Sequence, residues 1–238
     1  MKKVIALAMT VLLLLVLTVP TFAVEANTAT VLYKANQIVD PNMLMMRAEL
    51  GIDERSTTVK EALDITVRNN KINTRSATSA APEMFTTTQL TERKLLQDGS
   101  IEETYSTVGV TRSSLSDMAT DTQNSVTVYA VVNYTTRLVN YTLVEARYDG
   151  SEHRVVYPSA VDTYDLEMIA NIDDGIDSLY RNTRTIASPS NGTWYGLNSP
   201  SSSYFSLKFS FIAYTAVQAD NGAAPEASCE VDLHWVDP

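Results

Sequence analysis

Residues 125–134 read Ser-Val-Thr-Val-Tyr-Ala-Val-Val-Asn-Tyr, and this stretch decides the fold class. Apolar side chains occupy every second position from Val126 to Val132, so one face of an extended segment is apolar. Further strands are expected at 163–171, 204–217 and 228–236, bounded by loops rich in Ser and Thr. Because no helical periods separate these strands, the pattern predicts a mainly β chain, an antiparallel β-sandwich rather than a parallel α/β sheet.

Two Asp-Gly pairs indicate hairpin turns in the same part of the chain. Asp98-Gly99 predicts one hairpin. Asp149-Gly150 predicts a second hairpin over 141–158, in which opposite charges meet on one face and apolar groups meet on the other.

The sequence ahead of these strands has a helical pattern. Asp40 is a suitable N-cap for a first helix that ends before Gly51. Thr58 and Glu61 fit a capping box for a second helix, whose apolar residues recur at helical spacing as far as Val67. The sequence therefore predicts an N-terminal helical hairpin.

The first 23 residues have the parts of a signal peptide. Lys2 and Lys3 precede an uncharged apolar run, which ends at Pro20 and offers small residues for cleavage after Ala23. An uncleaved membrane anchor is the alternative, because the uncharged stretch reaches Val24 and is nearly long enough to span a bilayer. The expected organisation is a signal peptide (1–23), a helical region (24–73), a linker (74–84) and a β-sandwich domain (85–238).

Composition narrows the possible functions. The chain has 18 Lys and Arg against 28 Asp and Glu, a net charge of −10, which opposes binding of nucleic acid or anionic lipid through bulk charge. The single cysteine, Cys229, excludes an internal disulfide and leaves either a buried thiol or an intermolecular disulfide. Export with almost no cysteine is typical of a Gram-positive bacterium.

Residues 28–72 resemble the ribbon-helix-helix fold of antitoxin-type DNA-binding proteins, with a short strand at 29–33 followed by two helices. The resemblance implies that this strand enters the major groove of DNA. Here the strand is Ala-Thr-Val-Leu-Tyr, without the basic and polar residues of that family. Together with the acidic total charge, this favours a packed helical hairpin and no nucleic-acid partner.

The sequence contains none of the short catalytic motifs of common hydrolases, such as Gly-x-Ser-x-Gly or His-Glu-x-x-His. A dyad of Cys229 and His234 is disfavoured, because alternation along a strand directs the two side chains to opposite faces. No catalytic residue is assigned, and the chain is expected to be non-enzymatic. Unrecognised carboxylates leave a secreted hydrolase open.

Acidic residues supply two candidate metal sites. Asp173, Asp174 and Asp177 surround a glycine turn and could bind Ca²⁺, although their spacing differs from that of an EF-hand. The alternative is a turn before a short helical stretch at 177–181. The outward face of the last strand carries a second set, Glu230, Asp232 and His234. A solvated strand face is the preferred interpretation of that set.

Trp194-Tyr195, between two glycines, is the candidate ligand-binding site, since aromatic rings on such a loop can stack on a sugar. Covering one end of a sandwich core is the alternative role. We expect a secreted, non-enzymatic binding module for an extracellular or cell-wall ligand, with binding at the loops 149–152, 171–177 or 188–203. A secreted toxin or pore-forming protein that inserts a hairpin at 85–111 is the alternative.

Overall fold

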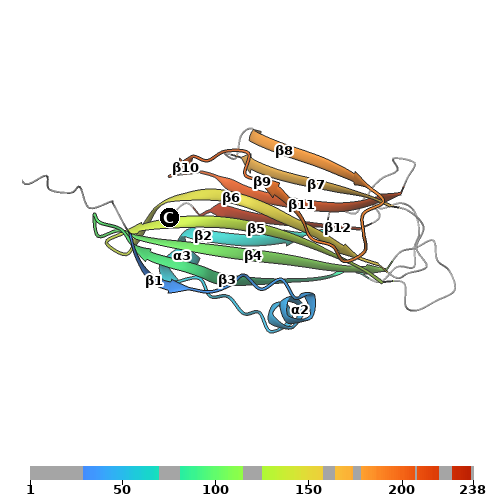
Figure 1. The fold of residues 1–238 in the computed structure, drawn as a ribbon, viewed down its shortest axis with the longest axis horizontal. Coiled ribbons are helices and arrows are strands. Elements are labelled where there is room, and N and C mark those ends of the chain that lie inside the picture. The colour runs from blue at the N-terminus through green and yellow to red at the C-terminus, as the bar shows by residue number, and fades with distance from the viewer. Residues whose placement is uncertain are drawn as a thin grey trace, which may run out of the picture.

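The computed structural model describes residues 29–69, 81–114, 125–157, 164–173, 178–206, 208–219 and 227–236. The predicted signal peptide and residues 74–80 of the predicted linker lie outside these ranges. Within them the chain is mainly β and its sheets are antiparallel, as the alternation predicted. Figure 1 shows the long strands running side by side along the long axis of the molecule.

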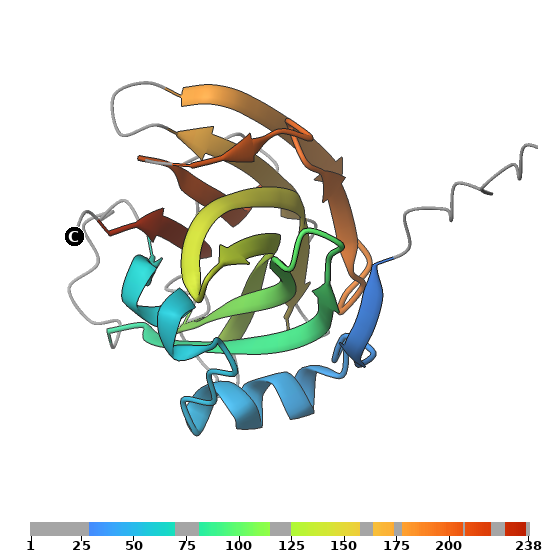
Figure 2. The ribbon, with the colours of Figure 1, turned by 90° about the vertical axis from the view of Figure 1, so that its left-hand side faces the viewer.

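The first sheet contains seven strands. They are β1 (Thr30–Lys34), β3 (Glu83–Leu95), β4 (Ile101–Ser114), β5 (Ser125–Val139), β6 (Thr142–Val156), β9 (Tyr195–Asn198) and β10 (Tyr204–Phe205). The order is β1-β3-β4-β5-β6-β10, and β9 pairs with β6 as well. Such long strands accumulate right-handed twist, and Figure 2, which looks along them, shows the sheet curling.

The second sheet contains five strands. They are β2 (Leu63–Arg68), β7 (Tyr164–Asp173), β8 (Ser178–Ala187), β11 (Ser210–Ala219) and β12 (Ala227–Trp235), in the order β2-β12-β11-β7-β8. The segment 204–217, expected as one strand, is divided between β10 and β11. The helical stretch expected at 177–181 is wrong, because β8 begins at Ser178 and pairs with β7.

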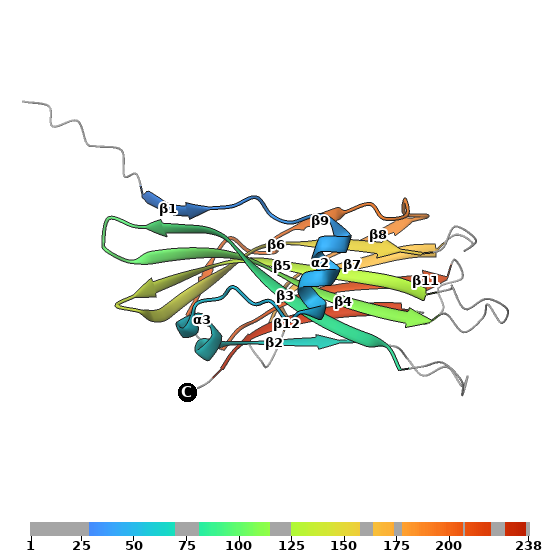
Figure 3. The same ribbon diagram turned by 90° about the horizontal axis from the view of Figure 1, so that it is seen from below.

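The main core lies between the two sheets. Alternation buries Val126, Val128, Ala130 and Val132 of β5 completely, and the same core includes Val231 of β12. A smaller apolar cluster lies on the opposite face of the first sheet, where Val108 and Val110 of β4 meet α2 (Pro41–Glu49). Figure 3 shows α2 lying across β3 and β4.

The first predicted helix is confirmed. The Asp40 carboxylate caps α2 by accepting hydrogen bonds from two backbone N–H groups of the first turn, at 2.8 and 3.0 Å. The helix ends at Glu49, and Gly51 follows with a φ of +62°. Neither helix in the described part of the chain is long and apolar enough to cross a membrane.

The second predicted helix is wrong over most of its length. The helix α3 covers Thr57–Ala62 only, and residues 63–68 form β2, which pairs with β12. Three of these residues, Ile65, Thr66 and Val67, are β-branched and favour a strand. The resemblance to a ribbon-helix-helix protein ends here, because residues 30–68 supply one strand to each sheet.

The predicted turn at Asp149-Gly150 is also wrong. β6 continues through both residues, and its pairing with β5 skips Asp149, which makes a β-bulge. Gly150 has a φ of +139°, a backbone conformation that residues with a Cβ rarely adopt, so the bulge requires glycine at this position. The turn between β5 and β6 is Asn140-Tyr141 instead. The hairpin predicted at Asp98-Gly99 does form, between β3 and β4.

Candidate ligand-binding pocket

A pocket of about 310 Å³ lies where the β5–β6 turn, α3 and the end of β12 come together. Figure 3 shows α3 and the end of β12 at the same end of the molecule. We call it the α3 pocket. Two aromatic side chains, one carboxylate and two hydroxyls contribute to its lining: Tyr141, Trp235, Glu61, Thr58 and Thr142. Apolar side chains, among them Leu143, complete it.

Tyr141 has an unusual backbone conformation. Asn140 and Tyr141 form the tight turn with φ values of 50° and 62°. Glycine is the preferred second residue of such a turn, because a side chain with a Cβ costs about 1–2 kcal/mol in the left-handed region. The Tyr141 side chain is 84% exposed, so burial in the core does not offset this cost.

Trp235, the last residue of β12, is the second aromatic residue of the lining. Its ring packs edge-on against the Phe209 ring with 5.5 Å between centroids, and its backbone N–H donates to the Phe209 carbonyl at 3.0 Å. The next residue, Val236, donates its backbone N–H to the carbonyl of Ala62 in α3 at 2.9 Å. The end of β12 is therefore attached to α3 beside the pocket.

The predicted capping box does not form, and this leaves two polar side chains facing the pocket. Ser56 is the N-cap of α3, but its hydroxyl donates to the Glu103 carboxylate at 3.0 Å instead of capping the helix. Thr58 and Glu61 lie inside the helix. Among the described residues, neither side chain has a hydrogen-bond or ion-pair partner, so both are available to a ligand.

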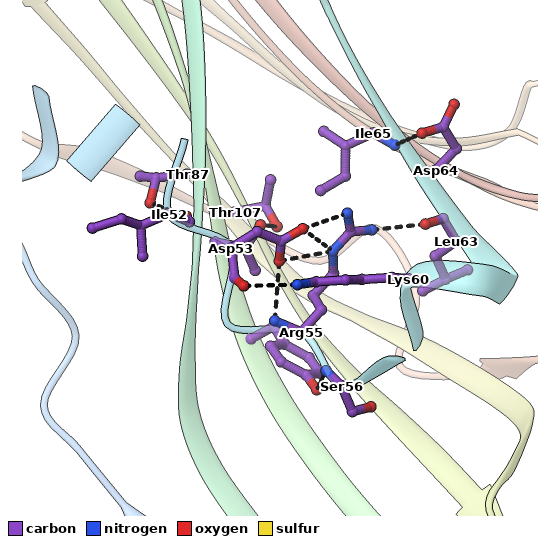
Figure 4. Close-up of polar contacts among 12 residues, drawn as sticks. Ile52, Asp53, Arg55, Ser56, Lys60, Leu63, Asp64, Ile65, Thr87 and Thr107 are labelled. Atoms are coloured by element: carbon purple, nitrogen blue, oxygen red, sulfur yellow. Dashed lines mark hydrogen bonds and ion pairs between the residues drawn. The ribbon is translucent and has the colours of Figure 1, made fainter. Parts of the chain in front are cut away.

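A salt bridge fixes the loop before α3. Arg55 lies against the Asp53 carboxylate with its terminal nitrogen 2.7 Å from Oδ2, and it donates to the Leu63 carbonyl at 2.7 Å (Figure 4). Lys60 donates to the carbonyl of Asp53 at 2.9 Å. Burial works to raise the pKa of Asp53, but the hydrogen bonds and charge of Arg55 outweigh it and lower the pKa below its usual value.

A buried carboxylate fixes the helix to the first sheet. Glu103 of β4 is 2% exposed and accepts hydrogen bonds from the hydroxyls of Tyr105 at 2.6 Å and Ser56 at 3.0 Å. Arg93 of β3 donates to its other oxygen at 2.8 Å. Burial raises the pKa of Tyr105, and the charge of Glu103 raises it further. These contacts hold α3 in one position relative to the strands.

Three buried residues of the core, Ser151, His153 and Thr215, are hydrogen-bonded in series in a way that resembles a hydrolase triad. Ser151 is 2.7 Å from Nε2 of His153, and Nδ1 of that ring is 2.8 Å from the Thr215 hydroxyl. The three residues are 2%, 0% and 0% exposed. Burial lowers the pKa of His153 to about 3. A substrate cannot reach Ser151, so these three hydrogen-bonded residues do not form an active site.

The residues proposed for metal binding are only partly described. Asp173 is the last residue of β7, while Asp174 and Asp177 lie outside the described residues. Arg68 of β2 forms ion pairs with two residues of β12, Glu230 at 3.4 Å and Asp232 at 3.5 Å. Within the ranges that the structure covers, no group of three His, Cys, Asp or Glu side chains is arranged to hold a metal ion. The Ca²⁺ site stays a prediction.

Trp194 and Tyr195 lie on opposite faces of the first sheet, as neighbours in an extended segment do. Trp194 packs edge-on against Tyr129 at 5.7 Å on the α2 side, and its Nε1 donates to the Val39 carbonyl at 3.0 Å. Tyr195 packs against the main core, and its hydroxyl accepts from the Ser190 backbone N–H at 2.9 Å. The pair does not form one stacking surface.

The residues of the α3 pocket were missed from the sequence, although one signal was present. Asn140-Tyr141 separates two long stretches of apolar alternation, and an Asn in that place indicates a tight turn.

Comparison with known proteins does not identify the site further, since no protein-family model, no curated protein and no solved structure matches this chain.

Proposed function

We propose that this chain is an exported, non-enzymatic binding module, a β-sandwich that holds an extracellular or cell-wall ligand in the α3 pocket. The observation that carries the proposal is Tyr141, an aromatic side chain 84% exposed at a turn position with φ of 62°. Strained backbone persists where the surrounding structure enforces it, and it is concentrated at functional sites.

Stability alone does not account for this tyrosine. Glycine would relieve the strain, and a polar residue would remove an exposed ring from the surface. A tyrosine ring offers a ligand one apolar face and one hydroxyl, which suits recognition. We therefore assign the Tyr141 side chain to ligand contact.

The backbone on two sides of the pocket, in the β5–β6 turn and in α3, is held in place before a ligand arrives, and this supports binding. The turn joins two strands of 15 residues each, and Glu103 and Arg55 fix α3 through the hydrogen bonds described above. A preformed site loses little conformational entropy on binding, so more of the contact energy contributes to affinity.

Sedimentation with washed Gram-positive cell walls tests the proposal. The mature chain, residues 24–238, is mixed with walls and centrifuged, and the bound fraction is compared with that of Tyr141→Gly. We expect the wild-type protein in the pellet and at least tenfold weaker binding by the variant. The free energy of unfolding of Tyr141→Gly should rise by about 1 kcal/mol, because the strain is relieved.

Tyr33→Ser is the matched control, because Tyr33 is also an exposed tyrosine (43%) but lies on the edge strand β1. This variant should bind walls as the wild type does. Equal binding by wild type and Tyr141→Gly would refute the pocket as the site. A wild-type protein that stays in the supernatant would refute the wall ligand.

A further inference from the structure

The charge of the α3 pocket is negative and not neutralised by the chain. Among the described residues that line the pocket, Glu61 alone carries a formal charge at neutral pH. Its carboxylate is exposed and makes no hydrogen bond or ion pair with another described residue. An unpaired carboxylate beside apolar walls favours a cation as its partner.

The basic residues nearest in sequence are bound elsewhere. The Lys60 ammonium donates to the Asp53 carbonyl at 2.9 Å. The Arg55 guanidinium is held between the Asp53 carboxylate and the Leu63 carbonyl. Glu61 therefore faces the pocket without an internal counter-ion, and the net charge of −10 attracts cations to the whole protein.

The residues that line the α3 pocket besides Glu61 favour an organic cation over a metal ion. Ca²⁺ requires six to eight oxygen ligands, whereas the pocket offers one carboxylate and the hydroxyls of Thr58 and Thr142 as side-chain oxygens besides the phenol of Tyr141. The rings of Tyr141 and Trp235 attract a cation through their π-systems, an interaction well known for quaternary ammonium groups.

The apolar lining further selects an alkylated ammonium. A primary ammonium has three N–H donors and needs an acceptor for each when it leaves water. Leu143 offers no acceptor, but it can pack against methyl groups. On the basis of the proposed function, we infer that the α3 pocket binds a trimethylammonium group, with the rings of Tyr141 and Trp235 against its methyls and Glu61 as its counter-ion.

Calorimetric titration of the mature protein with three small probes tests the inference. The probes are choline chloride, its neutral carbon isostere 3,3-dimethyl-1-butanol, and butylammonium chloride, all at the same ionic strength. We expect choline to bind at least tenfold more tightly than either of the other two. Glu61→Gln should weaken choline binding about tenfold and leave the isostere unchanged. Glu49→Gln is the control, because Glu49 lies on α2.

Each other outcome has a separate meaning. Equal binding of choline and the isostere would overturn the charge requirement, and tighter binding of butylammonium would overturn the choice of an alkylated ammonium. If no probe binds while cell walls still retain the protein in a Tyr141-dependent way, the ligand class is wrong and the proposed function stands. Wall binding that is independent of Tyr141 would refute the α3 pocket as the binding site and the inference with it.

Discussion

His153 of β6 donates a hydrogen bond from Nδ1 to the hydroxyl of Thr215 of β11, 2.8 Å away across the two sheets. The direction is fixed because Thr215 donates its own proton to the carbonyl of Tyr129 at 2.9 Å. Nε2 of the ring is then the acceptor for the Ser151 hydroxyl at 2.7 Å. The fully buried imidazole is neutral, with both nitrogens satisfied, and no carboxylate is among its hydrogen-bond partners.

Acid should therefore destabilise the fold through His153. Burial lowers its pKa from 6.5 to about 3, so between these values the unfolded chain binds a proton that the folded chain excludes. Its contribution to stability is complete above about pH 6.5 and is lost as the pH falls toward 3, by up to about 1.4 kcal/mol for each pH unit. Urea denaturation at a series of pH values measures this slope.

His153→Gln separates this effect from the titration of carboxylates. The variant should be less stable than the wild type at pH 8, because the two hydroxyls lose a matched partner. The difference in free energy of unfolding between the wild type and His153→Gln should become smaller as the pH falls from 6.5 to 4. A difference that stays constant over this range would show that His153 is protonated in the folded protein.

Of the glycines that the structure describes, Gly109 leaves the least room for a Cβ, and the atoms that fill this space come from the second sheet. A Cβ at this position would overlap Cγ2 of Val231 and lie 3.2 Å from Sγ of Cys229 and 3.3 Å from Cγ1 of Val67. Gly109→Ala should lower the free energy of unfolding by about 1–3 kcal/mol, the usual cost of overfilling a packed core.

Gly196→Ala is the matched control in strand β9, since the nearest atom to its Cβ would be the Ser151 carbonyl oxygen at 3.9 Å. Chemical denaturation of both variants, read by tryptophan fluorescence, makes the comparison. If Gly109→Ala and Gly196→Ala lower the free energy of unfolding equally, the two sheets are not closely packed at Gly109.

The fold class could be predicted because alternation over single strands is a local property. The Asp149-Gly150 turn could not, because a β-bulge and a tight turn both use glycine at positive φ. The choice depends on the partner strand: β5 has 15 residues, and β6 matches it only by continuing through the bulge. That information lies in pairing between strands and not in the local sequence.

The candidate site was hidden for the same reason. Glu61, Tyr141 and Trp235 are far apart in the sequence and meet only through the order of the strands. The apparent capping box at Thr58 was misleading, because the true N-cap, Ser56, bonds to Glu103, 47 positions away. Local sequence patterns show which residue types are present, but they do not show that these residues lie together in one pocket.

Glu103 should be essential for the position of α3. Glu103→Gln removes the charge that Arg93, Tyr105 and Ser56 all contact and leaves their donors poorly matched. We expect a loss of about 1–3 kcal/mol in the free energy of unfolding, the usual cost of leaving buried hydrogen-bonding groups without a matched partner. Glu92→Gln removes a partly exposed carboxylate that pairs with Lys34 and Lys94, and it should lower the free energy of unfolding by less than about 1 kcal/mol. Thermal and urea denaturation measure the free energy of unfolding of both variants. Equal losses in Glu103→Gln and Glu92→Gln would contradict the structural role assigned to Glu103.

Cys229 should be unreactive in the folded protein. The residue is 0% exposed between the sheets, and burial raises the pKa of its thiol to about 12. A thiol reagent should label it only when the sheets open, so the labelling rate should follow the population of opened molecules and rise steeply with urea. Mass spectrometry after timed labelling measures this rate, and a non-reducing gel should show no disulfide-linked dimer. Fast labelling without urea would place the thiol at the surface and make an intermolecular disulfide available.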